Sequence, residues 1–277
     1  GDFVIEGDRF GNTLIGGDGD NEIRPFATAS DEVVKGGAGD DTIIWGTYLR
    51  GNDYNYDYYR TEYFLSQFTL ENFQYLYSYY GSFDGGIGED TIKFDLRNDF
   101  IHGSQWNEST GPERTYYIDF TQADVTGFEK FVVTSSNYTS SGVTYSYAPD
   151  GFYFTATQLA QFNTIDGAKI FVKGGGTVDI SQITLLNGAT VEFADDENVT
   201  FTGTDQGDVI TTQGGDDTID AGEGADVITA GAGTDTVNAG DGNDVVVISG
   251  ESIVLDNLDG GSGSDTLRVL GGAIDLS

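Results

Sequence analysis

The chain has 277 residues with 46 acidic and 12 basic side chains, a formal net charge of −34 and no cysteine. Affinity for nucleic acid depends on lysine and arginine contacts to phosphate, so this charge balance argues against a nucleic-acid partner. A disulfide-stapled domain is excluded, and no stretch approaches the apolar length of a membrane span.

Residues 1–45 are predicted to form a short array of glycine- and acid-rich repeats. The clearest copies read GGDGDNEIR (16–24) and GGAGDDTII (36–44), each with an aliphatic residue two positions after its sixth residue. The sixth positions of successive copies are Asn12, Asn21, Glu32 and Asp41. Two extra residues, around Arg24 and Pro25, interrupt the phase. We expect Asn21 and Asp41 to lie on neighbouring turns and to be ligands of a shared metal ion.

Residues 46–84 are predicted to be an aromatic-rich insertion, with ten Tyr and four Phe among the 36 positions from Tyr48 to Phe83. On a strand, alternate residues share one face. Two such rows consist of Tyr54, Tyr56 and Tyr58, and of Tyr75, Tyr77 and Tyr79. Exposed rows could bind a surface glycan or another copy of the chain, whereas buried rows would form cross-strand ladders.

A single further repeat, GGIGEDTIK (85–93), follows the insertion. If the insertion leaves the array as a loop, this copy is expected to stack so that Asp90 lies on Glu32. Asp90 and Glu32 are therefore candidate metal ligands.

Residues 94–200 are predicted to be rich in strands. The runs AKIFVKG (168–174), TVDIS (177–181), ATVEF (189–193) and NVTFTG (198–203) recur about every 8–12 residues and lead directly into the last segment. This spacing favours a parallel β-helix over a separate sandwich. TATQLAQF (155–162) is expected to form one or two helical turns that begin at Thr155 or Thr157.

Residues 201–277 contain the most regular pattern in the chain. Aspartates stand nine residues apart, and an aliphatic residue follows each by two positions. The aspartates are Asp208, Asp217, Asp226, Asp235 and Asp244, and the aliphatics are Ile210, Ile219, Ile228, Val237 and Val246. Such a period predicts one turn and one short strand, repeated. If alternate repeats stack, residues 18 apart lie above one another, and the five aspartates form three shared sites.

The residue types of the repeat suit calcium. Glycine allows tight turns with positive φ and unobstructed carbonyl oxygens, and aspartate adds an anionic oxygen at the same turn. Calcium takes six to eight oxygen ligands, so two turns must share each ion. We expect several ions, held by these aspartates with carbonyl groups of the turn glycines, which are Gly222, Gly224, Gly231, Gly233, Gly240 and Gly242. An insertion over 248–259 leaves open whether Asp265, in the copy GGSGSDTLR (260–268), joins Asp244.

These copies resemble the nonapeptide GGxGxDxUx of the RTX, or haemolysin-type, calcium-binding family, in which U is a large aliphatic residue. The resemblance covers roughly 7–45, 85–93 and 203–268. It implies an all-β fold: a right-handed parallel β-roll or β-helix solenoid with calcium between turns. It also implies export by bacterial type I secretion and an extracellular or cell-surface location. With no methionine in the chain, we expect a piece of a longer protein.

The favoured function is a calcium-dependent structural module of a secreted or cell-surface protein, of surface-layer or adhesin type, that folds on calcium after export. The alternatives are a carbohydrate-binding module that uses the tyrosine rows, or the noncatalytic part of a type I-secreted enzyme. The chain itself is not expected to be an enzyme, because it has one histidine, His102, and lacks HExxH, GxSxG and P-loop motifs. A disordered acidic surface would explain the charge but gives no reason for aliphatics at a fixed offset from each aspartate.

Overall fold

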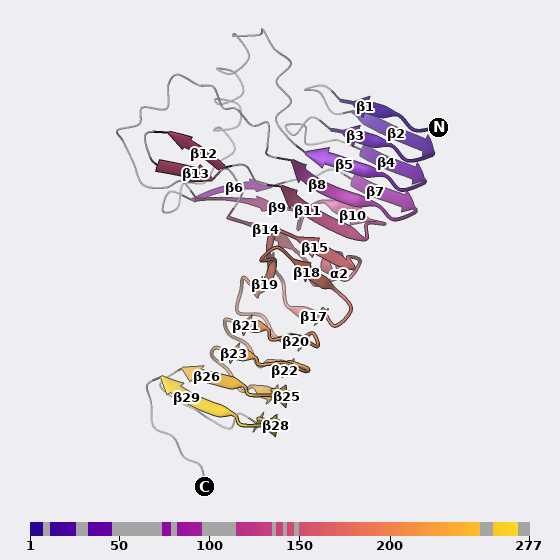
Figure 1. Cartoon of the computed structure of the whole chain (residues 1–277). Coiled ribbons are helices and arrows are strands. Elements are labelled where there is room, and N and C mark those ends of the chain that lie inside the picture. The colour runs from indigo at the N-terminus through magenta and orange to yellow at the C-terminus, as the bar shows by residue number, and fades with distance from the viewer. Residues whose placement is uncertain are drawn as a thin grey trace. The chain divides into compact units, whose positions relative to one another are not determined.

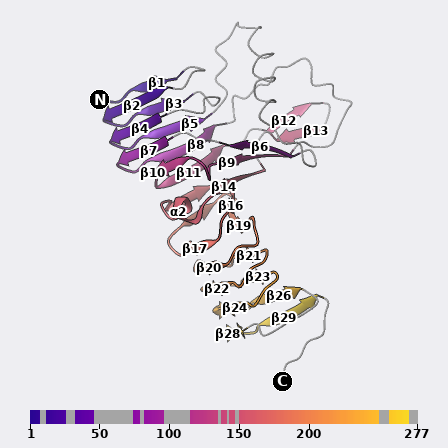
Figure 2. The same cartoon turned by 180° about the vertical axis from the view of Figure 1, so that it is seen from behind.

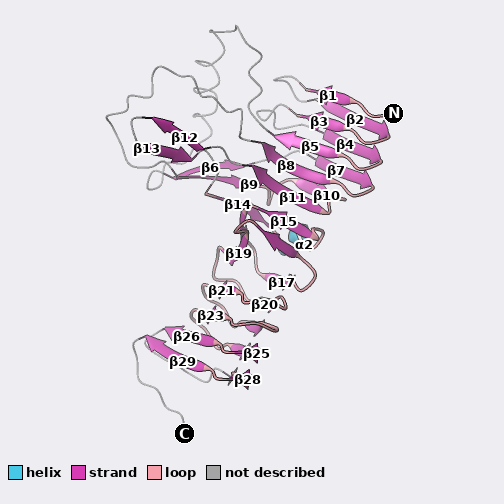
Figure 3. Ribbon diagram, viewed as in Figure 1, coloured by secondary structure: helices cyan, strands magenta, loops and turns pink. Residues whose placement is uncertain are grey.

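The computed structural model describes residues 1–7, 12–25, 33–45, 74–78, 82–95, 115–134, 137–140, 143–146, 150–249 and 257–270. Strands dominate these ranges, and the short helix among them is α2 (Ala156–Leu159) (Figure 3). No helix in this part of the chain is long and apolar enough to cross a membrane. The chain forms two compact units, residues 1–152 with 166–168 and residues 153–165 with 169–277.

The first unit contains stacked coils whose strands form two parallel sheets joined by glycine-rich turns (Figure 1). One sheet contains, in order, β1 (Val4–Glu6), β3 (Glu22–Arg24), β5 (Thr42–Trp45), β8 (Thr91–Asp95) and β11 (Lys130–Thr134). The other contains β2 (Thr13–Asp18), β4 (Val33–Ala38), β7 (Ser82–Ile87) and β10 (Asp124–Thr126). The strands of both sheets can be followed from the opposite side in Figure 2.

The strand register corrects one predicted pairing. Thr42 pairs with Thr91, so the copy at 85–93 stacks directly on the copy at 36–44 although the insertion separates them in sequence. Asp90 therefore lies on Asp41, and the prediction that it stacks on Glu32 is wrong. Glu32 itself lies outside the described residues.

The insertion is described only in part. Strand β6 (Gln74–Ser78) pairs in parallel with β9 (Thr115–Asp119), which places the backbone of Tyr75 and Tyr77 in a strand as predicted. The side chains of both residues, and all of Tyr54, Tyr56, Tyr58 and Tyr79, lie outside the described part of the chain. Further on, β12 (Asn137–Ser140) and β13 (Val143–Ser146) form an antiparallel hairpin.

The core of the first unit is an aliphatic column that widens into an aromatic cluster. Ile23, Ile43 and Ile92 lie in register on β3, β5 and β8, and all three are fully buried. Phe131 continues this column on β11 and packs against Phe152, with ring centroids 4.9 Å apart. The change from isoleucine to phenylalanine fills a broader interior with few additional residues.

The second unit contains a parallel β-helix that continues into a narrow roll, as predicted. Its main sheet contains β17 (Gly176–Asp179), β20 (Val199–Thr202), β22 (Thr218–Asp220), β24 (Thr236–Asn238) and β27 (Asn257–Asp259). A second sheet contains β21 (Val209–Thr211), β23 (Val227–Thr229), β26 (Val245–Ser249) and β29 (Thr266–Leu270). The remaining strands are β14 (Gly151–Phe154), β15 (Thr164–Asp166), β16 (Lys169–Val172), β18 (Thr184–Leu186), β19 (Thr190–Phe193), β25 (Asp241–Gly242) and β28 (Ser262–Gly263).

The interior of the roll contains the two predicted aliphatic columns. Ile210, Ile228 and Val246 lie in register in one sheet, and each is at most 5% exposed. Ile219 and Val237 are paired in the other sheet. Each of these strands therefore contributes one large aliphatic side chain to a column, which fixes the strand register because a one-residue slip would expose the whole column.

The predicted helical turn is present and capped. The Thr155 hydroxyl accepts a hydrogen bond from the Gln158 N–H, and the Gln158 side chain accepts one from the Thr155 N–H. This reciprocal capping box begins α2 at Ala156.

Candidate metal sites between stacked turns

The sixth-position aspartates of the roll stack as the nine-residue period predicts. The N–H of Asp208 donates to Asp226 Oδ1 at 2.7 Å, and the N–H of Asp226 donates to Asp244 Oδ1 at 2.9 Å. The N–H of Asp244 donates in turn to Asp265 Oδ1 at 3.2 Å. The structure thus places Asp265 on Asp244, 21 residues on, and the insertion before it is accommodated without breaking the stack.

The alternate repeats form a second stack on the other side of the roll. The N–H of Asp217 donates to Asp235 Oδ1 at 3.0 Å, and the N–H of Val199 donates to Asp217 Oδ1 at 2.9 Å. The three predicted neighbours, Asp208 with Asp226, Asp217 with Asp235 and Asp226 with Asp244, are therefore brought together.

An equivalent stack runs through the first unit. The backbone N–H and side-chain amide of Asn21 both donate to Asp41 Oδ1, at 2.7 and 2.9 Å. The N–H of Asp41 donates to Asp90 Oδ1 at 2.7 Å. Below it, the N–H of Asp90 donates to Glu129 Oε2 at 2.7 Å. The predicted pair of Asn21 and Asp41 is present, and the stack extends two turns further.

The second carboxylate oxygens of these aspartates are buried without a hydrogen-bond partner among the described residues. They are the Oδ2 atoms of Asp41, Asp90, Asp217, Asp226 and Asp244. Each of these residues is at most 1% exposed. A buried carboxylate oxygen with no donor costs free energy, and a bound cation removes that cost. The arrangement therefore suits a positively charged ligand.

Where a repeat begins with glycine, as at Gly36 and Gly203, that glycine leaves the space that such a cation requires. A Cβ atom added at Gly36 would collide with the carbonyl oxygen of Gly85 in the next turn and lie 2.5 Å from Asp41 Oδ2. At Gly203 it would collide with the Ala221 carbonyl oxygen and lie 2.8 Å from Asp208 Oδ2. A carboxylate and a carbonyl oxygen from adjacent turns thus face the same small space, which is the hard-oxygen donor set calcium prefers.

The other predicted glycines lie in the same turns. A Cβ at Gly240 would collide with Gly222 O, and one at Gly242 with Gly224 O. Gly231 approaches Gln213 O and Gly233 approaches Gly215 O in the same way. Two of the predicted carbonyl donors also accept inter-turn hydrogen bonds: Gly222 O from Asp241 N at 3.0 Å and Gly240 O from Ser262 N at 2.8 Å.

Side chains alone do not form a complete metal site in the described ranges, where no group of three or more acidic, histidine or cysteine side chains is placed to hold an ion. A cation between turns would therefore need backbone carbonyl oxygens in addition to the stacked carboxylates. This requirement agrees with the role predicted for the turn glycines.

Burial also changes the acidity of the stacked aspartates. Removal from water raises the pKa of Asp226 to about 6, and the neighbouring Asp208 and Asp244 add to this rise. Burial raises the pKa of Asp90 to about 6, with further contributions from Asp41 and Glu129. Burial raises the pKa of Asp217 as well. Without a counter-charge these groups resist ionisation, whereas a divalent cation favours the charged form.

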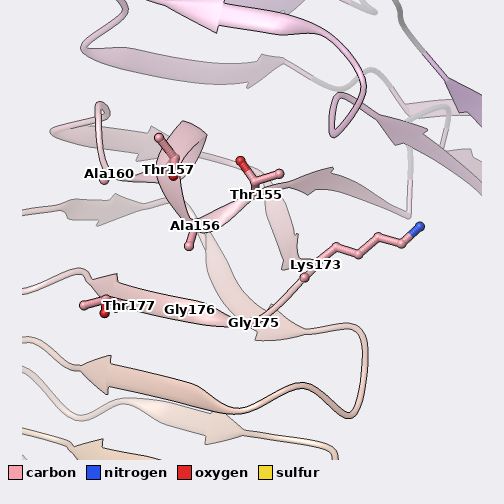
Figure 4. Close-up of a pocket in the computed structure, with 9 residues that line it drawn as sticks. Thr155, Ala156, Thr157, Ala160, Lys173, Gly175, Gly176 and Thr177 are labelled. Atoms are coloured by element: carbon pink, nitrogen blue, oxygen red, sulfur yellow. The ribbon is translucent and has the colours of Figure 1, made fainter.

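A separate hollow of about 480 Å³ lies beside α2 and residues 173–177, which lead into β17 (Figure 4). Small threonine, alanine and glycine residues dominate its lining. Lys173 extends away from α2, and its ammonium lies 5.7 Å from the centroid of the Tyr153 ring. Ligand pockets are usually lined by apolar and aromatic side chains around a few placed polar groups, so this hollow is not a candidate recognition site.

Sequence reasoning missed Glu129 as a member of the first-unit stack. The segment FEKFVVT (128–134) belongs to the region predicted only to be rich in strands, because the turn before it lacks the nonapeptide. The available signal was Gly127 followed by Phe131 and Val133, whose alternation matches that of the repeat strands.

Comparison with known proteins supports the repeat assignment. A family model that consists of four copies of the RTX calcium-binding nonapeptide repeat matches the chain in several places. The matched residues are 4–24, 26–44, 200–228, 211–246 and 256–273. No curated protein matches the chain. The copy at 85–93 and the turn at 127–129 lie outside the matched segments. The copy at 85–93 stacks on the matched repeat at 36–44, and the turn at 127–129 stacks on that copy.

Proposed function

This chain is a protein with RTX calcium-binding nonapeptide repeats, and from that premise we propose that it is a calcium-dependent structural module of a secreted bacterial protein. Calcium ions between the turns would replace much of the hydrophobic core that the narrow roll lacks. The proposed ligands are the stacked residues of both units with turn carbonyl oxygens. These residues are Asn21, Asp41, Asp90, Asp208, Asp217, Asp226, Asp235, Asp244 and Asp265.

The observation that supports this function best is the row of buried Oδ2 atoms that have no hydrogen-bond partner among the described residues. A purely structural stack would gain nothing from burying anionic oxygens without donors. In a calcium-binding stack the same atoms are ligands.

Charge distribution supports folding on calcium after export. From Gly174 to Leu267 the chain has 19 acidic residues and no Lys or Arg. Folding this segment without counterions would concentrate like charge and order many glycines, and both effects oppose folding. Extracellular calcium modules bind with dissociation constants of about 10⁻⁴–10⁻³ M, so such sites stay empty in a calcium-poor cytoplasm and fill outside the cell.

Far-UV circular dichroism during a calcium titration tests the proposal. The expected result is a largely disordered spectrum in excess chelator and a cooperative gain of β signal at calcium concentrations of about 10⁻⁴–10⁻³ M. Magnesium at the same concentration is the control, since its smaller ion demands a stricter octahedral shell. A full β spectrum in chelator would contradict calcium-dependent folding.

The finer proposal is a surface-layer or adhesin role without catalysis, in which calcium-loaded chains associate. Regular stacking and the lack of catalytic motifs in the sequence support it. Light scattering on the calcium-loaded protein across a concentration series tests this role. We expect assemblies that disperse on chelation; monomers at every concentration would count against self-assembly and leave the structural module intact.

A further inference from the structure

We infer that Glu129 and Asp90 form a calcium site at a turn that lacks the nonapeptide repeat, which extends the ion stack of the first unit by one turn. The inference rests on the proposed function, because it assigns a further site of the same chemistry. It starts from the strand register. Thr126 pairs with Asp84 and Lys130 pairs with Thr91, so the turn at 127–129 lies against the turn at 85–90.

The side of this site that Asp90 and Gly85 form matches the repeat sites elsewhere in the chain. Asp90 is fully buried, and its Oδ2 atom has no hydrogen-bond partner among the described residues. A Cβ atom added at Gly85 would collide with the Gly127 carbonyl oxygen and lie 2.7 Å from Asp90 Cβ. Gly85 thus approaches the Gly127 carbonyl oxygen as Gly36 approaches the Gly85 carbonyl oxygen in the neighbouring turn.

The turn at 127–129 supplies the second carboxylate of the site. Glu129 Oε2 accepts the Asp90 N–H at 2.7 Å, and Asp90 Oδ1 accepts the Asp41 N–H at the same distance in the neighbouring turn. The turn at 127–129 has three residues where the repeat has six, and the longer reach of glutamate brings its carboxylate to the same position. Buried Phe128 anchors the turn.

The adjacent lysine forms its ion pair with another carboxylate, although its charge also attracts Glu129. The Lys130 ammonium binds Glu89 Oε2 at 2.6 Å, at the end of an outer row in which Asp40 Oδ1 accepts the Glu89 N–H at 3.0 Å. That ion pair compensates the outer row, whereas the inner pair of Asp90 and Glu129 keeps its need for a cation. Because the short turn offers fewer carbonyl oxygens, the affinity should be lower than in the complete repeats.

Hydrogen exchange with mass spectrometry across a calcium titration of the full chain tests the inference with Glu129→Gln. Glutamine keeps an oxygen that can accept the Asp90 N–H but removes the charge. The matched control is Glu89→Gln, which removes the same charge one residue from Asp90 on the outer row. Exchange is followed separately in residues 82–95 with 124–134 and in residues 205–249.

The expected result for Glu129→Gln is a calcium midpoint raised on the order of tenfold in 82–95 and 124–134, with the midpoint of 205–249 unchanged. Glu89→Gln should leave both midpoints within about twofold. Equal midpoints in Glu129→Gln and the unsubstituted chain would overturn this site alone. Calcium-independent protection of 205–249 in the unsubstituted chain would instead overturn the proposed function.

Discussion

At the scale of single residues, Gly203 lies close to the next turn of its stack. Because a Cβ atom at Gly203 would overlap the Ala221 carbonyl oxygen, alanine would separate the turns or displace the Asp208 carboxylate. The glycines of the repeat are not equivalent in this respect. Gly214 also lies in the roll, but a Cβ there would meet only the side chain of Asp196, at 3.2 Å.

We therefore predict that Gly203→Ala destabilises the calcium-loaded roll by about 1–3 kcal/mol, the usual range for overpacking a tight site. Gly214→Ala should change stability by less than about 1 kcal/mol, since the exposed Asp196 side chain can move aside. Thermal unfolding of both variants in saturating calcium measures the difference. Equal stabilities would show that the space at Gly203 has no role in turn packing.

At the scale of elements, each short strand depends on the turn before it. Strands of three residues such as β21, β22 and β23 bury one aliphatic side chain each, so the stacked aspartates and their ions must supply the remaining stabilisation. Asp226 is central to this arrangement, because it accepts the Asp208 N–H and donates its own N–H to Asp244.

We predict opposite effects of Asp226→Asn with and without calcium. Asparagine can still accept the Asp208 N–H, but it removes a buried charge, so the metal-free fold should become more stable. The calcium midpoint of folding should rise on the order of tenfold, because two adjacent turns lose an anionic ligand. Circular dichroism in chelator and in calcium measures both effects.

Asp205→Asn is the matched control for this pair of measurements, since Asp205 is exposed in the preceding turn. It should leave the calcium midpoint within about twofold. A destabilised metal-free state in Asp226→Asn would argue that the carboxylate serves as an ordinary hydrogen-bond acceptor and not as a ligand.

The sequence was sufficient to predict most elements of the roll. In the first unit it did not predict all of the stacked pairs. In the roll, each aspartate has an aliphatic residue at a constant offset, so the period gives both the register and the stacked pairs. In the first unit, inserted segments of different length separate the repeats. The pairing of Asp90 with Asp41 spans 49 residues and depends on strand pairing that spacing cannot reveal.

Glu129 was missed for a related physical reason. A turn shortened by three residues can place a glutamate where a repeat places an aspartate, because the extra methylene compensates for the missing backbone. Pattern matching weighs residue type at a fixed offset, whereas the stack requires only a carboxylate near the next N–H. Spacing could not predict the pairing of Asp265 with Asp244 for the same reason. The last coil is three residues longer than the regular coils, and this extra length does not alter the register of the two aspartates.

At the scale of the whole molecule, the net charge of −34 makes the metal-free fold sensitive to pH. Burial raises the pKa of Asp90 and Asp226 from the ordinary 3.8 to about 6. In the metal-free folded state these groups hold protons that the unfolded chain releases near its lower pKa. Their contribution to stability is therefore complete below the unfolded pKa and is lost as pH rises through about 6.

We accordingly predict that protons partly replace calcium. In chelator, the β signal should increase as pH is lowered from about 8 to about 5, because stability falls with rising pH wherever the native state binds more protons. In calcium the effect should reverse: each buried site must release its protons to bind the ion, so affinity should fall on the order of tenfold per pH unit below about 6. Circular dichroism and calcium titration at matched pH values measure both trends.

Asp226→Asn serves as the control, since removing one of the titrating groups should flatten both pH dependences. A metal-free fold that becomes less stable on acidification would contradict the role assigned to these carboxylates.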